Sequence, residues 1–179
     1  MTDIHKVSQR LLLVALIAVV GAWVGIGAAT TLAQEDIGSD TGMFLILAEA
    51  SSKEDLRPLG PGEQVTKHDH KFLRENEARP ARYFILHEHA DVPLELAEPV
   101  RSRQGRLGTT ELSFMLTPKA AATAERMSRE NLGKNVALLI DGEVITAHTV
   151  RAVITDGRFV LSRCTDNACE YIRARLDPR

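Results

Sequence analysis

The feature that most restricts the fold is a strand, a helix and a hairpin that follow one another in the last third of the chain. Apolar and polar residues alternate over residues 111–116, which predicts a strand with one face in the core. Thr117 and Pro118 predict a helix start, because threonine caps free N–H groups and proline suits the first helical position. Gly133 predicts the end of this helix. Its expected apolar face consists of Ala120, Ala124, Met127 and Leu132.

The next elements are predicted to be strands joined by glycine turns. Residues 135–140 form an apolar run that predicts a strand, and Asp141-Gly142 is a strong hairpin signal because glycine tolerates positive φ. Residues 143–147 are the expected return strand. Asp156-Gly157 marks a further turn before a strand at residues 159–161.

The C-terminal residues leave two structures open. The segment from Cys164 to Cys169 is either a disulfide-stapled hairpin tip or the start of a last helix. We favour the helix, because Cys169, Ile172 and Leu176 have the spacing of one helix face. Thr165, Asp166 or Asn167 would cap it. In either case the two cysteines predict a structural disulfide in an oxidising compartment, since their spacing is CxxxxC and not the redox-active CxxC.

The preceding part of the chain adds strands to the same domain. Residues 43–48 and 82–87 are expected strands, and residues 51–62 are an expected loop. Aromatic residues make up only 4% of the chain, so the core must be mostly aliphatic. The sequence therefore predicts an α+β fold: a small mixed or antiparallel sheet with two helices packed on one face, preceded by an N-terminal apolar helix.

The N-terminus carries an export signal. Residues 11–29 contain no charge, and they follow a short segment that includes Lys6 and Arg10. Small residues before Gln34 are typical of a signal-peptide cleavage site, whereas the length of the apolar run suits a retained membrane anchor. Both alternatives stay open, and both place the rest of the chain outside the cytoplasm. The expected domains are a leader or anchor at 1–33, a linker at 34–42 and a folded domain at 43–179 with its core at 111–176.

The order and spacing of the motifs between residues 117 and 157 resemble the first periplasmic, or head, domain of the SecD/SecDF protein-export family. Strong similarity covers residues 111–176 and weaker similarity covers residues 43–176. The chain departs from the family at Ala147-His148, where the family usually has proline. The residues that match the family motifs are Thr117, Asn131, Gly133, Lys134, Asp141, Gly142 and Gly157.

The resemblance implies a periplasmic or inner-membrane, envelope-exposed bacterial protein. SecD-type machines couple proton flow to movement of an exported chain through charged transmembrane helices, whereas this chain has one uncharged apolar segment. Only the head function is therefore expected: non-enzymatic binding of an exported polypeptide or envelope protein partner, through an exposed sheet edge or helix face. The formal net charge of −2 gives no indication of nucleic-acid binding. The sequence contains neither G-x-S-x-G nor a phosphate-binding P-loop motif.

Four histidines support an alternative function. His68 and His70 form one H-x-H pair, and His87 and His89 form another. Residues i and i+2 share one face of a strand, so each pair could present two imidazoles to one zinc or copper ion. The alternative hypothesis is a periplasmic metal-binding protein; otherwise no cofactor is expected.

Overall fold

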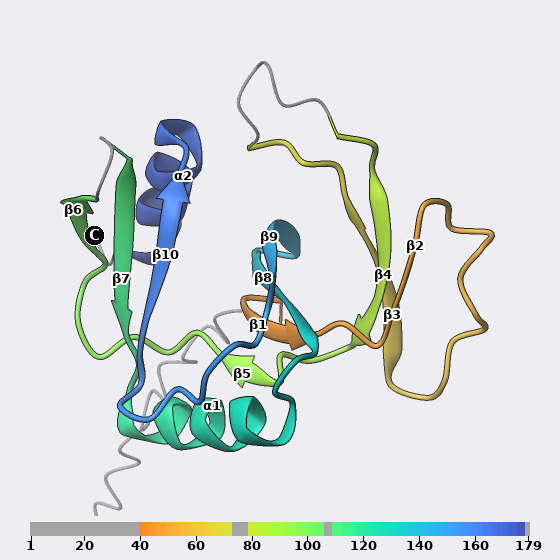
Figure 1. Ribbon diagram of the computed structural model, residues 1–179, viewed down its shortest axis with the longest axis horizontal. Coiled ribbons are helices and arrows are strands. Elements are labelled where there is room, and N and C mark those ends of the chain that lie inside the picture. The colour runs from red at the N-terminus through yellow and green to blue at the C-terminus, as the bar shows by residue number, and fades with distance from the viewer. Residues whose placement is uncertain (1–39, 73–78, 106–108, 178–179) are drawn as a thin grey trace, which may run out of the picture. The chain divides into compact units, whose positions relative to one another are not determined.

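The structure, a computed structural model, describes residues 40–72, 79–105 and 109–177, all within the compact unit 34–179 (Figure 1). Every described strand pair is antiparallel, and the described residues contain the helices α1 (Pro118–Glu130) and α2 (Asp166–Leu176). The predicted α+β class and antiparallel pairing are confirmed. The strands lie in three small sheets, however, and not in the single sheet that was expected.

The four-stranded sheet has the order β5 (Val92–Pro93), β1 (Gly42–Leu45), β8 (Asn135–Ile140) and β9 (Glu143–Thr149). All four residues of β1 are buried, which explains why its sequence is apolar without alternation. The β8–β9 turn places Asp141 at φ 51° and Gly142 at φ 75°, so the predicted hairpin is confirmed.

The other two sheets have three strands each. One has the order β10 (Arg158–Cys164), β7 (Thr110–Met115) and β6 (Arg101–Gln104). The other has the order β2 (Ala48–Ala50), β4 (Arg82–His87) and β3 (Glu63–His68). Figure 1 shows β3 and β4 running side by side along their full length, in agreement with a six-residue ladder from Glu63↔His87 to His68↔Arg82.

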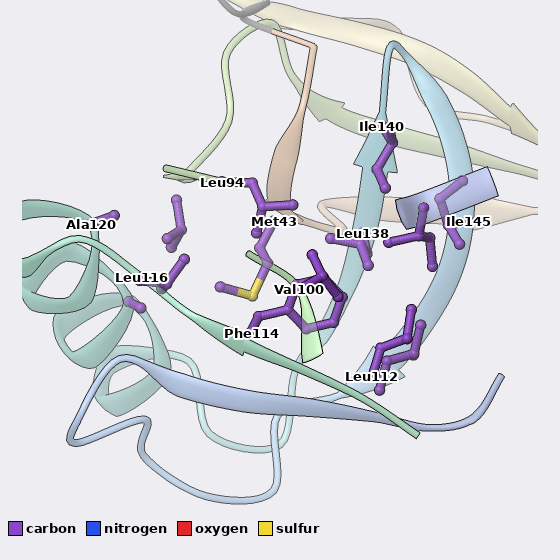
Figure 2. Close-up of a cluster of buried hydrophobic side chains, with 14 of the residues drawn as sticks. Met43, Leu94, Val100, Leu112, Phe114, Leu116, Ala120, Leu138, Ile140 and Ile145 are labelled. Carbon is purple, nitrogen blue, oxygen red and sulfur yellow. The ribbon is translucent and has the colours of Figure 1, made fainter. Parts of the chain in front are cut away.

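The larger hydrophobic core joins the four-stranded sheet, the β10–β7–β6 sheet and both helices. Figure 2 shows Met43 of β1 and Leu138 of β8 gathered with Phe114 of β7, and all three are buried. Phe114 also stacks on Phe159 of β10, with ring centroids 4.5 Å apart. A smaller core around Phe44, Phe84 and Leu139 connects β1 and β8 to β4.

Helix α1 forms where its capping residues predict. Thr117 is the N-cap, Pro118 is the first helical residue, and Ala120, Ala124 and Met127 are buried as expected. Leu132 is not part of this apolar face: it lies beyond the helix end and its side chain is 53% exposed. The prediction for Leu132 was wrong because the helix ends at Glu130, before the fourth position of the stripe is reached.

The N-terminal half differs more from the prediction. The expected strand at residues 43–48 is split into β1 and β2, and β1 already begins at Gly42, within the expected linker. Strands β3 and β6 were not predicted. The leader or anchor at residues 1–33 lies outside the described residues, and within residues 40–72, 79–105 and 109–177 no helix has the length and apolarity needed to span a membrane.

Candidate functional site

The motif residues at the start of α1 hold the helix against a neighbouring turn. Thr117 Oγ1 accepts a hydrogen bond from the Ala120 amide at 3.4 Å, and the Thr117 amide donates to the Glu95 carbonyl at 2.8 Å. Gly157 has φ 66°, and its carbonyl accepts from the Leu116 amide at 3.0 Å. A Cβ at Gly157 would lie 2.6 Å from the Ala121 Cβ. Both motif residues therefore have structural roles.

The motif residues at the end of α1 close the helix onto the loop after β9. Asn131 Nδ2 donates to the Met127 carbonyl at 2.8 Å, and Lys134 Nζ donates to Asn131 Oδ1 at 2.9 Å. Gly133 has φ 81°, and its amide donates to the Val150 carbonyl at 2.9 Å. These contacts satisfy groups at the helix terminus, which is again a structural role.

The Asp141-Gly142 turn connects three parts of the domain. The Asp141 amide donates to Thr41 Oγ1 at 2.8 Å, and the Gly142 amide donates to the Asp40 carbonyl at 3.0 Å. Arg175 Nη1 of α2 donates to Asp141 Oδ2 at 2.7 Å. The turn thus binds the residues before β1 and the end of the last helix. The motif residues together make the scaffold, and a binding surface must be sought elsewhere.

The two histidine pairs lie at opposite ends of one strand ladder. His68 pairs with Arg82 at the start of β4, whereas His87 is the last residue of β4 and pairs with Glu63. Five residue steps separate the two positions, about 17 Å at the rise of a β-strand. A single site with all four imidazoles, including His89, is therefore not assembled.

Each pair has a different environment. The His68 and His70 ring centroids are 3.9 Å apart, and burial lowers the pKa of His68 to about 4. Burial also lowers the pKa of His70. His87 Nδ1 instead lies 2.8 Å from Asp91 Oδ1, and the other carboxylate oxygen of Asp91 accepts from the Leu45 amide at 2.7 Å. Among the described residues, no group of three or more His, Cys, Asp or Glu side chains is arranged to hold a metal ion.

The cysteine pair lies where β10 ends and α2 begins. β10 ends at Cys164, and Cys169 is buried in the first turns of α2. The predicted helix and its apolar face are confirmed, with Ile172 fully buried. Thr165 is the N-cap by position, but its hydroxyl donates to the Phe72 carbonyl at 2.8 Å and not to the helix. The disulfide itself stays a prediction.

Strand β10 supplies a candidate binding edge that the sequence did not reveal. It pairs with β7 on one side, and no other described strand pairs with its second side. Phe159 and Leu161 pack inward, whereas the Val160 side chain is 44% exposed. The sequence signal for this edge was Val160, an apolar residue in the last strand. The sequence pattern alone cannot tell whether such a residue is exposed or buried.

Known proteins are similar in sequence to the region of the chain that contains this edge. Residues 85–169 match the family described as "SecDF, P1 head subdomain". The "Protein translocase subunit SecDF" of Thermus thermophilus is 38% identical over 56 residues, which cover 31% of this chain and 8% of that protein. The chain thus spans a small part of its curated relative's length.

Solved SecDF structures are also similar to part of the chain. A membrane component SecDF that enhances protein export is 32% identical, with a TM-score of 0.40 over 47% of this chain and 39% of that chain. A translocon-associated SecDF from Thermus thermophilus is 32% identical, with a TM-score of 0.39 over 51% of this chain and 14% of that chain. The predicted resemblance is confirmed by the sequence matches: residues 85–169 are similar to the SecD/SecDF head domain.

Proposed function

We propose that this chain is a non-enzymatic, envelope-exposed domain that binds an exported polypeptide or an envelope protein partner. The observation that carries the proposal is the match of residues 85–169 to the SecDF P1 head subdomain. The similar Thermus thermophilus protein is a translocase subunit, and a similar solved SecDF is described as a component that enhances protein export. An accessory role in protein export follows for this chain as part of the proposal.

The proposed binding mode is addition of an extended peptide to the outer edge of β10. An edge strand presents unpaired N–H and C=O groups, and a peptide that pairs with them gains main-chain hydrogen bonds without requiring a particular sequence. That property suits a domain that must accept many polypeptides. Val160 adds an exposed apolar contact on the same strand. The β10 ladder has a register shift between Leu161 and Cys164, so its regular part runs from Arg158 to Leu161.

The opposite edge of the same sheet is less suited to peptide binding. All four residues of β6 are exposed, and two of them are arginines held in ion pairs. Arg103 Nε lies 2.8 Å from Glu111 Oε2, and Arg101 Nη2 lies 2.5 Å from Glu98 Oε2. Charged side chains on an edge strand discourage further pairing, because a new strand would have to displace or desolvate them. The proposal therefore commits to β10.

The test is site-specific photo-crosslinking in the full chain, expressed in its own host. A photoreactive residue replaces Val160 on β10, and the matched control replaces Leu59, which is 49% exposed in a loop. We expect crosslinks from position 160 to exported polypeptides or an envelope protein, and few or none from position 59. Equal crosslinking from both positions, or none from position 160, would refute binding at β10.

We also propose that the domain lies outside the cytoplasm, in the periplasm or on the periplasmic side of the inner membrane. The uncharged run at residues 11–29 supports this placement. Intact mass and membrane partition of the natively expressed protein test it. The mass of a chain that begins at Gln34, found in the soluble envelope fraction, indicates a released domain. The mass of the full-length chain, found in the membrane fraction, indicates a tethered one. Recovery in the cytoplasmic fraction would contradict both.

A further inference from the structure

We propose that His68 and His70 form a binding site for one imidazole-preferring transition-metal ion, copper or zinc. The proposal does not depend on polypeptide binding, and it concerns a different sheet. The supporting features are the closeness of the two rings, the nitrogen atoms they leave without partners, and the backbone that holds them there.

The chain brings these two rings together by a specific local conformation. His68 is the last residue of β3 and is only 7% exposed. His70 follows two residues later with φ 58°, a left-handed conformation that is uncommon for a residue other than glycine. The result is a ring–ring distance of 3.9 Å between centroids, with the planes tilted by 44°. An uncommon backbone conformation that orients a polar side chain is a feature often found at functional sites.

Each ring directs one nitrogen into the protein without a hydrogen-bond partner. Among the described residues, His68 Nδ1 and His70 Nε2 are buried polar side-chain atoms that lack a partner. Buried polar atoms are nearly always satisfied, so two in adjacent rings call for an explanation. A metal ion would satisfy both, because it accepts lone pairs from imidazole nitrogens.

The surroundings of the His70 ring indicate which nitrogen is available. The Pro80 backbone acts on the ring as a hydrogen-bond acceptor, which raises the pKa of His70 against the larger lowering by burial. Because Nε2 has no partner, the donor is Nδ1, and Nε2 is left with its lone pair. Metal-ligating histidines typically donate their second ring N–H to a carbonyl or carboxylate in this way.

The surroundings indicate how many ligands the described residues supply and which charges lie next to the two rings. Asp69 lies between the two histidines, but its Oδ1 accepts from the Lys71 amide at 3.3 Å in a local turn. No larger ligand cluster occurs in the described part of the chain, so the described residues supply two protein ligands. The charge of Arg79 lowers the pKa of both histidines, whereas the charge of Asp69 raises it, so the two charges next to the rings act on a bound cation in opposite directions. The titration therefore compares Cu⁺ and Zn²⁺ directly.

The experiment titrates the metal-free full chain with Cu⁺ and, separately, with Zn²⁺, each in competition with a chromophoric chelator. We expect one bound ion per chain. His70→Gln should weaken binding at least about tenfold, which is the range seen when a group that supports metal binding is lost. His70 is chosen because it is less buried than His68. Far-UV circular dichroism establishes that the variant is folded.

The matched control is the second histidine pair. The double variant His87→Gln/His89→Gln removes the same residue types at the same spacing from the other end of the ladder, and should leave binding unchanged. Thermal unfolding gives a second readout, since an ion that binds only the folded chain raises the unfolding temperature of the parent and control but not of His70→Gln. Absence of binding, binding that survives His70→Gln, or binding lost only in the control would each overturn the proposal.

Discussion

Replacing Gly157 with alanine should destabilise the domain in two ways, because the added Cβ strains the backbone and clashes with a neighbouring side chain. Gly157 has φ 66°, where an L-residue is strained. The added Cβ would also lie 2.6 Å from the Ala121 Cβ, a distance that real Cβ atoms do not tolerate. The nearest obstacle is the first carbon of a helical side chain, and not the far end of a flexible one, so it cannot move aside without shifting α1.

The expected loss can be worked out from these two effects. A left-handed backbone costs an alanine about 1–2 kcal/mol relative to glycine. An extra methyl group forced into a packed site costs about 1–3 kcal/mol more. Gly157→Ala should therefore reduce the free energy of unfolding by about 2–5 kcal/mol, measured by urea unfolding of the full chain with circular dichroism.

A matched control separates the backbone effect from the steric one. Gly133 also has positive φ, 81°, but a Cβ there would meet nothing within 4 Å. Gly133→Ala should lose only the backbone part, about 1–2 kcal/mol. Adding Ala121→Gly to the Gly157→Ala variant should recover part of the loss, because it removes the opposing methyl group. Equal losses for the two glycine variants, with no recovery from Ala121→Gly, would refute the steric argument.

Three further predictions concern other buried groups. Ser128 is fully buried and its Oγ accepts from the Ile154 amide at 2.9 Å, so Ser128→Ala should cost about 1–3 kcal/mol in urea unfolding by leaving that amide unsatisfied; a loss below about 0.5 kcal/mol would contradict this. If Cys164 and Cys169 form the predicted disulfide, the intact mass should be two hydrogen atoms lower than that of the reduced chain, and reduction should cost on the order of 2 kcal/mol; alkylation of both thiols in the unreduced, unfolded chain would exclude it. Burial lowers the pKa of His68 to about 4, so as the pH falls the unfolded chain binds a proton at this histidine before the folded chain does. With a metal chelator present, the stability contribution of neutral His68 should be complete above about pH 6.5 and lost as the pH falls toward 4. If His68→Gln does not flatten the dependence of stability on pH over this window, the assignment to His68 is wrong.

The parts of the fold that the sequence predicts well are those with strong local causes. Residues 135–140 form a strand with the predicted bounds, and so do residues 82–87, because both contain an apolar run that begins after a polar residue. Thr117-Pro118 and Asp141-Gly142 were placed correctly because proline and glycine fix backbone angles regardless of what surrounds them.

The missed elements lack such local causes. All four side chains of β6 are exposed and only His68 of β3 is buried, so neither strand shows the apolar alternation of a half-buried strand. These strands form because β7 and β4 offer hydrogen-bonding edges, which are contributed by distant parts of the sequence. The division into three sheets could not be predicted for the same reason, since it depends on which strands pair along their edges.

The candidate sites show the same limit. The i, i+2 spacing correctly suggested that His68 and His70 lie together, although their rings meet through a left-handed turn and not along a strand. The separation of this pair from His87 depends on the β3–β4 register, which the sequence did not give because β3 was not predicted. The open edge of β10 likewise depends on sheet order, and not on any local pattern.

The contacts of the Asp141-Gly142 turn have a mechanical consequence. β1 lies between β5 and β8, so a force that pulls on Asp40 along β1 acts in shear on the short β5 ladder and the four-residue β8 ladder at the same time. The same force reaches the turn through the bonds from Asp141 and Gly142 to Thr41 and Asp40, and passes to α2 through Arg175. A domain held from its N-terminal side can therefore bear tension without peeling open strand by strand.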